Sequence, residues 1–299
     1  MQQDYDIVIA GGGMVGASLA LALASTRLRV AVLEPVAASA EQQPSYDDRG
    51  IALSLSSQRI FRGLGVWPAV SGQANPIRNI HVSDRGHFGK VRMAAEELGL
   101  DSLGHVVIAR ELGGVLLQRL REQSNVDFLC PASLQQFSQS ADGVRLQVQS
   151  EEGETTLVCR LLVAADGTDS GVRRELAIAT REYDYQQSLI VCNVSTEKPH
   201  ADTAYERFTE DGPLALLPLR SNKCVLVFSC AGDRVSHFMT MKDEAFLEEV
   251  AQRMGKRLGR FYKLGTRRSY PVKSVLADQQ VTGRVLLRRP VNVLSCSIF

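Results

Sequence analysis

YDIVIAGGGMVGASLALALASTRLRVAVLE, residues 5–34, has the pattern of a complete βαβ unit. Tyr5 to Ala10 is a short apolar run bounded by glycines, which is typical of a buried strand. Met14 to Ala24 is a longer apolar run and indicates a helix, and Leu28 to Leu33 indicates a second strand. A strand, a glycine-rich turn, a helix and a second strand in this order predict a site for a dinucleotide.

Three glycines in G-x-G-x-x-G spacing give this unit its specificity. Gly11 permits the tight turn out of the strand, Gly13 lets the backbone approach a pyrophosphate, and Gly16 lets the helix pack closely on the sheet. The helix N-terminus then offers N–H groups to the phosphates. Glu34 ends the second strand, where its carboxylate can accept hydrogen bonds from ribose hydroxyls, so a 2′-phosphate on this nucleotide is not expected.

Two other interpretations of this segment are weaker. A purely structural glycine turn does not require three correctly spaced glycines and a terminal acid. A secretory signal needs a positive N-terminal region and an unbroken apolar core, whereas this segment carries Asp4 and Asp6 and contains three glycines. We therefore expect no targeting segment.

The composition narrows the class of protein. The chain has 299 residues, and 34 Lys and Arg against 33 Asp and Glu leave a net charge of +1, so no basic excess points to nucleic acid. No apolar run reaches transmembrane length. The six cysteines and five histidines are scattered, which favours buried thiols in a reducing compartment and predicts no metal site. The cytoplasm is the expected location.

The rest of the chain divides into an α/β part and a β-rich part. Strand patterns are expected at 77–84, 90–94, 105–109, 126–129, 135–138, 144–150, 155–165, 269–276 and 284–287, and helix patterns from Ser56 or Ser57 to Leu64 and at 111–123 and 242–258. Residues 37–48 are expected to form a loop. We expect a nucleotide-binding domain at 1–76, 95–181 and 271–299, and a second, β-rich domain at 77–94 and 182–270.

A second motif, LLVAADGTDSGVR, spans residues 161–173. An apolar strand would deliver Asp166 at its carboxyl end, where ligand sites of α/β sheets lie. Gly167 lets the backbone turn, and Ser170 is a candidate cap for the helix that follows. Because a carboxylate beside a pyrophosphate is repulsive, Asp166 is expected to face sugar hydroxyls or water. The alternative is an ordinary strand-to-helix corner.

Together these motifs resemble the class A FAD-dependent aromatic monooxygenases. That family combines an N-terminal G-x-G-x-x-G with an internal D-G-x-x-S-x-x-R, matched here by Asp166, Gly167, Ser170 and Arg173. The segment AYERFTEDGPLALLPL, residues 204–219, is similar to the ubiquinone-biosynthesis hydroxylases within it. The resemblance implies a Rossmann-like FAD-binding domain of the glutathione-reductase type with an inserted β-sheet substrate domain.

The resemblance also implies which residues contact FAD. Two arginines join the glycine motif because the family places one after the first loop, matched by Arg49, and one at the start of a helix, matched by Arg110. For each arginine the alternative is a solvated surface position. The expected cofactor-binding residues are Gly11, Gly13, Met14, Val15, Gly16, Glu34, Arg49, Arg110, Asp166 and Gly167. Tyr205 and Phe208 are candidates for the substrate pocket, and no catalytic acid or base is identified.

The implied activity is NAD(P)H-dependent hydroxylation of a prenylated phenol, of the 2-octaprenyl-6-methoxyphenol type, with molecular oxygen. A prenyl tail implies proximity to a membrane, with peripheral association at its inner face, and a ubiquinone-biosynthesis complex is an implied partner. Two alternatives stay open: an NAD-dependent dehydrogenase, and a non-catalytic nucleotide-binding remnant or assembly partner. The dehydrogenase does not explain Asp166 or Arg49.

The resemblance ends after Leu287. The family continues with a Gly-Asp or Gly-Asn motif that holds the flavin, whereas this chain continues as RRPVNVLSCSIF, residues 288–299. We therefore hypothesise a truncated or frame-altered member of the family. Such a chain would retain FAD weakly and have little hydroxylase activity, because flavin chemistry requires the exclusion of water.

Overall fold

The computed structural model describes residues 3–37 and 48–287. The tail at 288–299 and most of the predicted loop at 37–48 lie outside the described residues, so the hypothesis of truncation stays untested. The described residues form two compact units, one of residues 3–37, 110–183 and 275–287, the other of residues 48–109 and 184–274. In contrast to the predicted nucleotide-binding domain, the first unit does not contain residues 48–76 and 95–109, which group with the second unit. The predicted division into a nucleotide-binding and a substrate domain stays a proposal.

The first unit is built on a parallel sheet. Its strands run in the order β18 (Val281–Thr282), β19 (Val285–Leu287), β11 (Gly153–Ala164), β1 (Tyr5–Ala10), β2 (Val30–Leu33) and β8 (Val126–Leu129). The pairs that join β19, β11, β1, β2 and β8 are all parallel. Two further strands, β9 (Ala132–Gln139) and β10 (Val144–Ser150), extend antiparallel from β11. The central strands are buried apolar runs, as parallel strands covered on both faces require.

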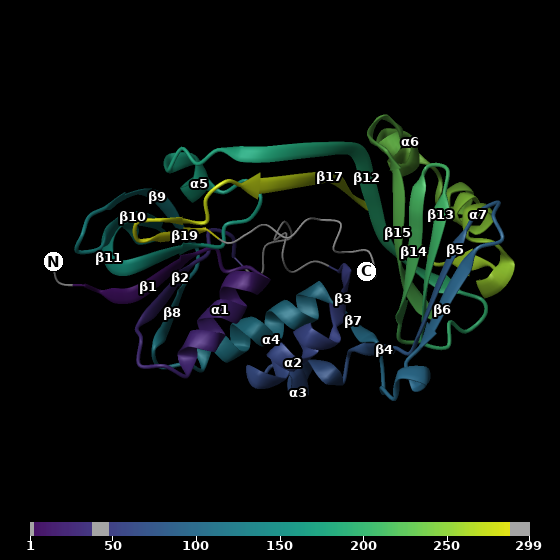
Figure 1. Cartoon of the computed structure of the whole chain (residues 1–299), viewed down its shortest axis with the longest axis horizontal. Helices are drawn as coiled ribbons and strands as arrows, with labels where there is room; N and C mark the ends of the chain where they lie inside the picture. The colour runs from purple at the N-terminus through teal and green to yellow at the C-terminus, as the bar shows by residue number, and fades with distance from the viewer. Residues whose placement is uncertain (1–2, 38–47, 288–299) are drawn as a thin grey trace. The chain divides into compact units, whose positions relative to one another are not determined.

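Helices and strands cover the two faces of this sheet. Figure 1 shows α1 (Met14–Ala24) and α4 (Ala109–Arg121) on one side, with β9 and β10 on the other. Alternation along β1 serves both faces: Val8 packs in a core with β9 and β10, whereas Ile9 faces Gly16 of α1. The short α5 (Gly171–Glu175) follows β11.

The second unit has a large mixed sheet and a small antiparallel one. The large sheet runs β16 (Phe261–Tyr262), β12 (Thr180–Thr196), β15 (Lys223–Ala231), β14 (Gly212–Leu219), β13 (Thr203–Thr209), β5 (Asn79–Asp84) and β6 (Lys90–Ala94), with β17 (Arg268–Ala277) also paired to β12. The small sheet runs β3 (Gly50–Ser54), β7 (Gly104–Ile108) and β4 (Asn75–Ile77). Residues of the small sheet pack in one apolar core with one face of the large sheet.

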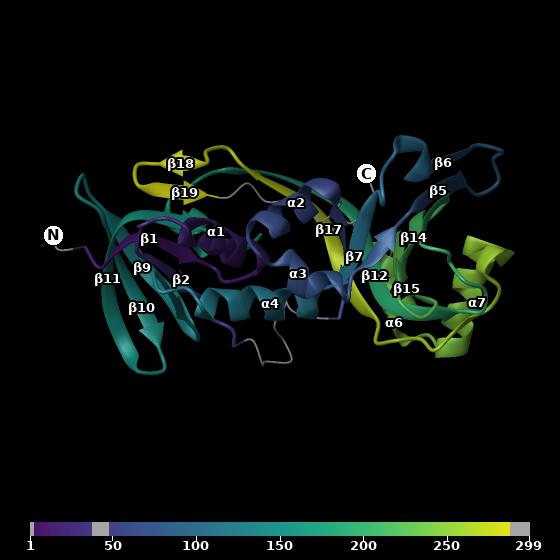
Figure 2. The same cartoon turned by 90° about the horizontal axis from the view of Figure 1, so that it is seen from below.

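Helices cover the other face of the large sheet. Figure 2, which shows the whole chain from below, labels α6 and α7 beside the strands of this sheet. Phe238 of α6 (Val235–Thr240) and Phe246 of α7 (Asp243–Met254) pack into a core with Phe228 of β15. The remaining helical segments are α2 (Leu55–Gly63), α3 (Trp67–Ser71) and the 3₁₀ turns η1 (Glu96–Leu98), η2 (Gly232–Arg234) and η3 (Lys256–Leu258).

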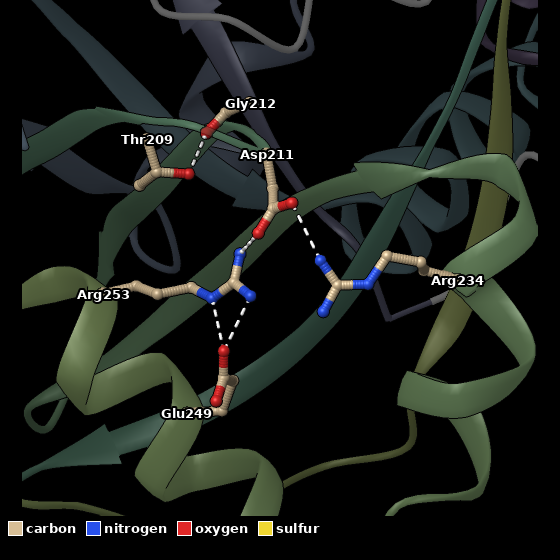
Figure 3. Close-up of polar contacts among 6 residues, drawn as sticks. All are labelled: Thr209, Asp211, Gly212, Arg234, Glu249 and Arg253. Carbon is tan, nitrogen blue, oxygen red and sulfur yellow. Dashed lines mark hydrogen bonds and ion pairs between the residues drawn. The ribbon is translucent and has the colours of Figure 1, made fainter.

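An ionic network around the buried Arg253 fastens α7 to the turn between β13 and β14 (Figure 3). The Arg253 guanidinium donates to Asp211 at 2.5 Å and to Glu249 at 2.7 Å, and its side chain is only 6% exposed. Arg234 donates to the other oxygen of Asp211 at 2.8 Å. The Arg253 guanidinium also lies 4.9 Å from the centre of the Phe228 ring. One arginine thus joins a helix, a turn and the aromatic core.

Most predicted elements are confirmed, and each difference has a physical cause. The predicted cap of α2 was wrong: Ser54, not Ser56 or Ser57, accepts from the Ser57 amide, because the chain up to Ser54 is held in β3. The helix predicted to reach residue 258 ends at Met254, where Gly255 has a φ of +83°. The predicted strand at 77–84 is two strands, since β4 and β5 belong to different sheets.

Candidate functional site

A cavity of about 450 Å³ opens in the first unit beside the glycine turn. It lies at the carboxyl ends of β1, β2 and β11, the edge at which parallel sheets bind ligands. Of the residues expected from the sequence, the cavity gathers five along its wall: Gly11, Gly13, Glu34, Asp166 and Gly167. The two motifs, separated by more than a hundred residues, therefore meet at one edge of the sheet.

The glycine turn is built so that only glycine fits at its key positions. Gly11 has a φ of +104°, and a Cβ there would overlap the Ala165 carbonyl on the neighbouring strand. At Gly16 a Cβ would overlap the Gly11 carbonyl oxygen, so α1 could not approach the turn. Gly13 is the N-cap of α1 and supplies no side-chain cap. The first turn of α1 also lacks an acid, so its N–H groups and partial positive charge suit a phosphate.

Glu34 holds the glycine turn from the end of β2. It is 7% exposed, and one carboxylate oxygen accepts from the Gly12 amide at 2.8 Å. The other accepts from the Val36 amide at 2.9 Å. Because a carboxylate can accept about four hydrogen bonds, these contacts are compatible with the expected contact to ribose hydroxyls. The contact of Glu34 with ribose stays a prediction, and sequence reasoning missed the role of Glu34 in fixing the turn.

Asp166 fixes the second turn in a similar way. Its carboxylate accepts from the Val172 amide at 3.2 Å, and Ser170 caps the same short helix by accepting from the Arg173 amide at 3.0 Å. Gly167, with a φ of +84°, turns the chain between them. The capping role expected of Ser170 is confirmed. Asp166 therefore stabilises the strand-to-helix corner and also lies on the cavity wall, so a structural role does not exclude a ligand-binding role.

The charged side chains of the cavity are all acidic, and the backbone N–H groups are its donors for a phosphate. Four carboxylates line it and no Lys, Arg or His does so among the described residues; the carboxylates belong to Glu34, Asp166, Asp169 and Glu175. Phosphates there would depend on backbone N–H groups and the N-terminus of α1, while the carboxylates suit hydroxyls. These residues fit the adenosine and pyrophosphate end of a dinucleotide.

The other expected site residues are not among those that line this cavity. Met14, Val15 and Gly16 form the first turn of α1 behind Gly13. Arg110 is an exposed residue near the start of α4. Arg49 belongs to the second unit, where its guanidinium lies 4.6 Å from the centre of the Tyr270 ring. Contact between these residues and a cofactor stays a proposal.

Sequence reasoning missed part of the wall. Pro35, Val36 and the start of β9, residues 132–135, also line the cavity. The signal for β9 was weak because only its later residues showed a strand pattern, yet the Ala132 amide donates to the Glu34 carbonyl and so places β9 there. The substrate-pocket candidates are in the second unit, where Tyr205 is buried and Phe208 is 47% exposed.

Other chemistries find no support in the part of the chain that the structure describes. No three His, Cys, Asp or Glu side chains cluster there as a metal site would require. Burial raises the pKa of the thiols of Cys192 and Cys224 to about 12 and that of Cys159 to about 11, so these thiols stay protonated. Among the helices in that part, none is long and apolar enough to span a membrane.

The comparisons with known proteins agree with this geometry. The FAD binding domain family matches residues 4–288. Ubiquinone hydroxylase UbiL of Rhodospirillum rubrum is 33% identical over 94% of this chain and 65% of its own length. The 3-demethoxyubiquinol 3-hydroxylase of Escherichia coli is 34% identical over 86% of this chain and 65% of its own length. This chain thus spans slightly less than two thirds of each of these two relatives.

Solved structures show the same fold. The p-nitrophenol 4-monooxygenase PnpA of Pseudomonas putida superposes with a TM-score of 0.78 at 18% identity, covering 96% of this chain and 72% of that one. Aklavinone-11 hydroxylase, solved with FAD and aklavinone, has a TM-score of 0.74 at 19% identity, covering 96% and 57%. The fold and the family match confirm the resemblance seen in the sequence: the chain belongs to the FAD binding domain family, among flavin-dependent monooxygenases related to the ubiquinone hydroxylases.

Proposed function

We propose that this chain acts in the FAD- and NAD(P)H-dependent hydroxylation of a prenylated phenol of the 2-octaprenyl-6-methoxyphenol type. In this reaction a phenol, molecular oxygen, NAD(P)H and a proton give the hydroxylated phenol, NAD(P)⁺ and water. The observation that carries the proposal is the cavity in which Gly11, Gly13, Glu34 and Asp166 meet. The substrate class is supported by relatives that are named ubiquinone hydroxylases.

The residues of this chain would bind and orient the cofactor. The backbone of Gly11 to Gly13 and the N-terminus of α1 would hold the pyrophosphate. Glu34 and Asp166 would accept hydrogen bonds from hydroxyl groups while they keep the two turns in place. FAD, when bound, supplies the redox and oxygen chemistry, and the protein supplies binding and orientation.

Arg49 and Arg110 are proposed as further cofactor contacts on the strength of the family pattern alone. A place in a ubiquinone-biosynthesis complex and peripheral attachment to a membrane belong to the same proposal. Relatives that are named ubiquinone hydroxylases support the pathway. Co-purification of this chain with other proteins of that pathway would test the complex, and sedimentation with vesicles would test the attachment.

The central experiment measures FAD binding and turnover together. Purified protein is titrated with FAD, and product from a prenylated phenol and NAD(P)H is followed by mass spectrometry. Glu34→Gln is the diagnostic variant, because an amide accepts at one oxygen only and its NH₂ group would oppose a backbone N–H. We expect its FAD affinity to fall by about tenfold to 100-fold, since losing one charge-assisted hydrogen bond costs roughly 1.5–3 kcal/mol.

Glu154→Gln is the matched control, because Glu154 is an exposed residue of β11 outside the cavity. It should bind FAD as the unaltered chain does. Binding of a nicotinamide nucleotide in place of FAD would favour the dehydrogenase and overturn the proposal. Tight FAD binding without any product would favour a non-catalytic nucleotide-binding protein.

A further inference from the structure

A second cavity, of about 460 Å³, lies in the second unit and has no residue in common with the first. Its wall comes from the hairpin of β5 and β6, from β13 and from the segment that links α7 to η3. The glycine motif does not border this cavity, whereas Tyr205, one of the two substrate-pocket candidates, lies on its wall. The charged groups of the cavity have no role in the function proposed above.

Two buried nitrogen atoms on this wall have no hydrogen-bond partner among the described residues: His81 Nε2 and Arg207 Nε. His81 is only 7% exposed, and its ring centre lies 5.8 Å from that of Tyr205. The strand register pairs His81 with Tyr205 and Ser83 with Arg207, so His81 and Arg207 lie on the same face of the sheet. A buried donor without an acceptor costs free energy, and an anionic ligand would remove that cost.

The Arg207 guanidinium is held in a fixed orientation. Its Nη1 donates to the Met254 carbonyl, the last of α7, at 2.9 Å. Gly255, with a φ of +83°, makes room for this arrangement, because a Cβ there would lie 2.9 Å from Arg207 Nη1. A guanidinium fixed at one nitrogen presents its remaining N–H groups in a defined direction, which suits a carboxylate or phosphate.

The rim of the cavity adds positive charge. Lys256, Arg257 and Lys90 are exposed residues of the rim, and the described residues include no ion pair to any of them or to Arg207. The acid on the rim, Asp84, is engaged by His87 at 3.0 Å. Arg207 and the three rim residues carry four positive charges, more than one carboxylate would neutralise. The cavity therefore favours an anion of higher charge.

One buried acid and the state of His81 complete the electrostatics. Glu206 also borders the cavity, but alternation along β13 directs its side chain away from the face of Tyr205 and Arg207. Burial raises the pKa of Glu206, which favours its neutral form. Burial, Arg257, Arg92 and Lys90 lower the pKa of His81 against a raising backbone hydrogen bond, so the imidazole is neutral and can act as a donor.

We propose that this cavity binds a phosphate-bearing anion, held by Arg257 and Lys256 at its rim and by Arg207 and His81 on its wall. The ligand chemistry is that of a diphosphate or a phosphorylated organic group. Such a group can belong to a free metabolite or to a lipid headgroup, and the experiment separates the two sources.

Isothermal titration of the full chain with inorganic pyrophosphate tests the site. We expect saturable binding of one equivalent, weakened at least tenfold in Lys256→Ala/Arg257→Ala, because the loss of even one charged hydrogen bond costs about a factor of ten. The matched control is Arg220→Ala/Lys223→Ala, which removes the same two charges from exposed positions of the second unit outside the cavity. It should bind as the unaltered chain does.

Two further measurements make the outcome decisive. The ring signals of His81 in nuclear magnetic resonance should shift on addition of pyrophosphate, a readout that does not depend on the folding of any variant. Sedimentation with phosphatidylglycerol vesicles is compared with sedimentation with phosphatidylcholine vesicles. A lipid headgroup is the source of the anion if the double variant Lys256→Ala/Arg257→Ala and competing pyrophosphate both reduce sedimentation with phosphatidylglycerol. Equal losses in both double variants, or no saturable binding of pyrophosphate and vesicles, would overturn the proposal.

Discussion

The two cavities are nearly equal in volume and opposite in the charge of their walls. The cavity of the first unit has four carboxylates and offers backbone N–H groups, whereas the cavity of the second unit has Arg207 and three exposed basic residues at its rim. The first cavity would bind phosphate through backbone N–H groups, and the second would bind it through basic side chains. A main-chain site depends on glycine and on a fixed turn, and a side-chain site depends on folded strands that bring distant residues together.

This difference predicts that, in the first unit, an added side chain at the glycine turn lowers ligand affinity more than the loss of a charged side chain does. In Gly16→Val the new Cβ would overlap the Gly11 carbonyl, so α1 must move away from the turn. We expect FAD affinity to fall about 100-fold, equivalent to about 2.8 kcal/mol, within the usual cost of overpacking. A titration that follows the quenching of flavin fluorescence measures this loss.

Gly114→Ala is its control, because a Cβ at that exposed position of α4 meets no atom within 4 Å. It should bind FAD normally and gain about 0.5–1 kcal/mol of stability from its helix propensity. Normal FAD binding by Gly16→Val would show that the close approach of α1 is not required.

The second unit should depend instead on the ionic network of Figure 3. Arg253→Met removes a guanidinium that is 6% exposed and leaves Asp211 and Glu249 without it. We expect the free energy of unfolding to fall by about 3 kcal/mol, the usual cost of breaking a buried pair, while FAD affinity changes little. Equilibrium denaturation by urea measures the change.

Arg234→Met tests whether burial is the cause. The Arg234 side chain is 42% exposed, so the same substitution should cost less than about 1 kcal/mol. Similar losses in the two variants would mean that charge number, not burial, decides the strength of the network.

The smallest expected effect is the response of this network to acid. Burial opposes ionisation of Asp211, but hydrogen bonds and charges from Arg253 and Arg234 outweigh it, and the pKa of Asp211 is lowered. A lowered pKa in the folded state stabilises the protein above the unfolded value of about 3.9, and this contribution is lost as the pH falls through the folded pKa.

Unfolding free energies of the unaltered chain and of Asp211→Asn, measured from pH 6 to pH 3, test this linkage. The difference between them should be constant above about pH 5 and shrink below about pH 4. Asp233→Asn, an exposed neighbour without a side-chain ion pair in the described structure, should show no such change. If the difference in unfolding free energy between the unaltered chain and Asp211→Asn did not vary with pH, Asp211 would not contribute to the loss of stability in acid.

The sequence was informative where the determinants are local. The G-x-G-x-x-G turn, the strand Val144–Ser150 and the capping of α5 by Ser170 each depend on neighbouring residues, and all were predicted correctly. The Ser54 cap was missed because it depends on the pairing of β3 with β7, which no local pattern reports. No local pattern reports that residues 48–76 group with the second compact unit either, since they join it through sheet contacts.

The second cavity could not be predicted from its sequence. His81 and Arg207 are 126 positions apart and become neighbours only through the parallel pairing of β5 with β13. Each is a single polar residue in a strand pattern, which normally indicates an exposed face. The available signal was the alternation of Tyr205 and Arg207, which places a cation on the same face as a buried aromatic residue.

The strand β6 ends the large sheet in the described structure, so its outer backbone groups face no neighbouring strand there. Lys90, Val91 and Arg92 are all exposed on it, and two of the three are cationic. An open strand of this kind can recruit a strand from another molecule, and closely spaced positive charges repel an identical edge. The basic hairpin beside the second cavity would therefore also limit aggregation of the protein at high concentration.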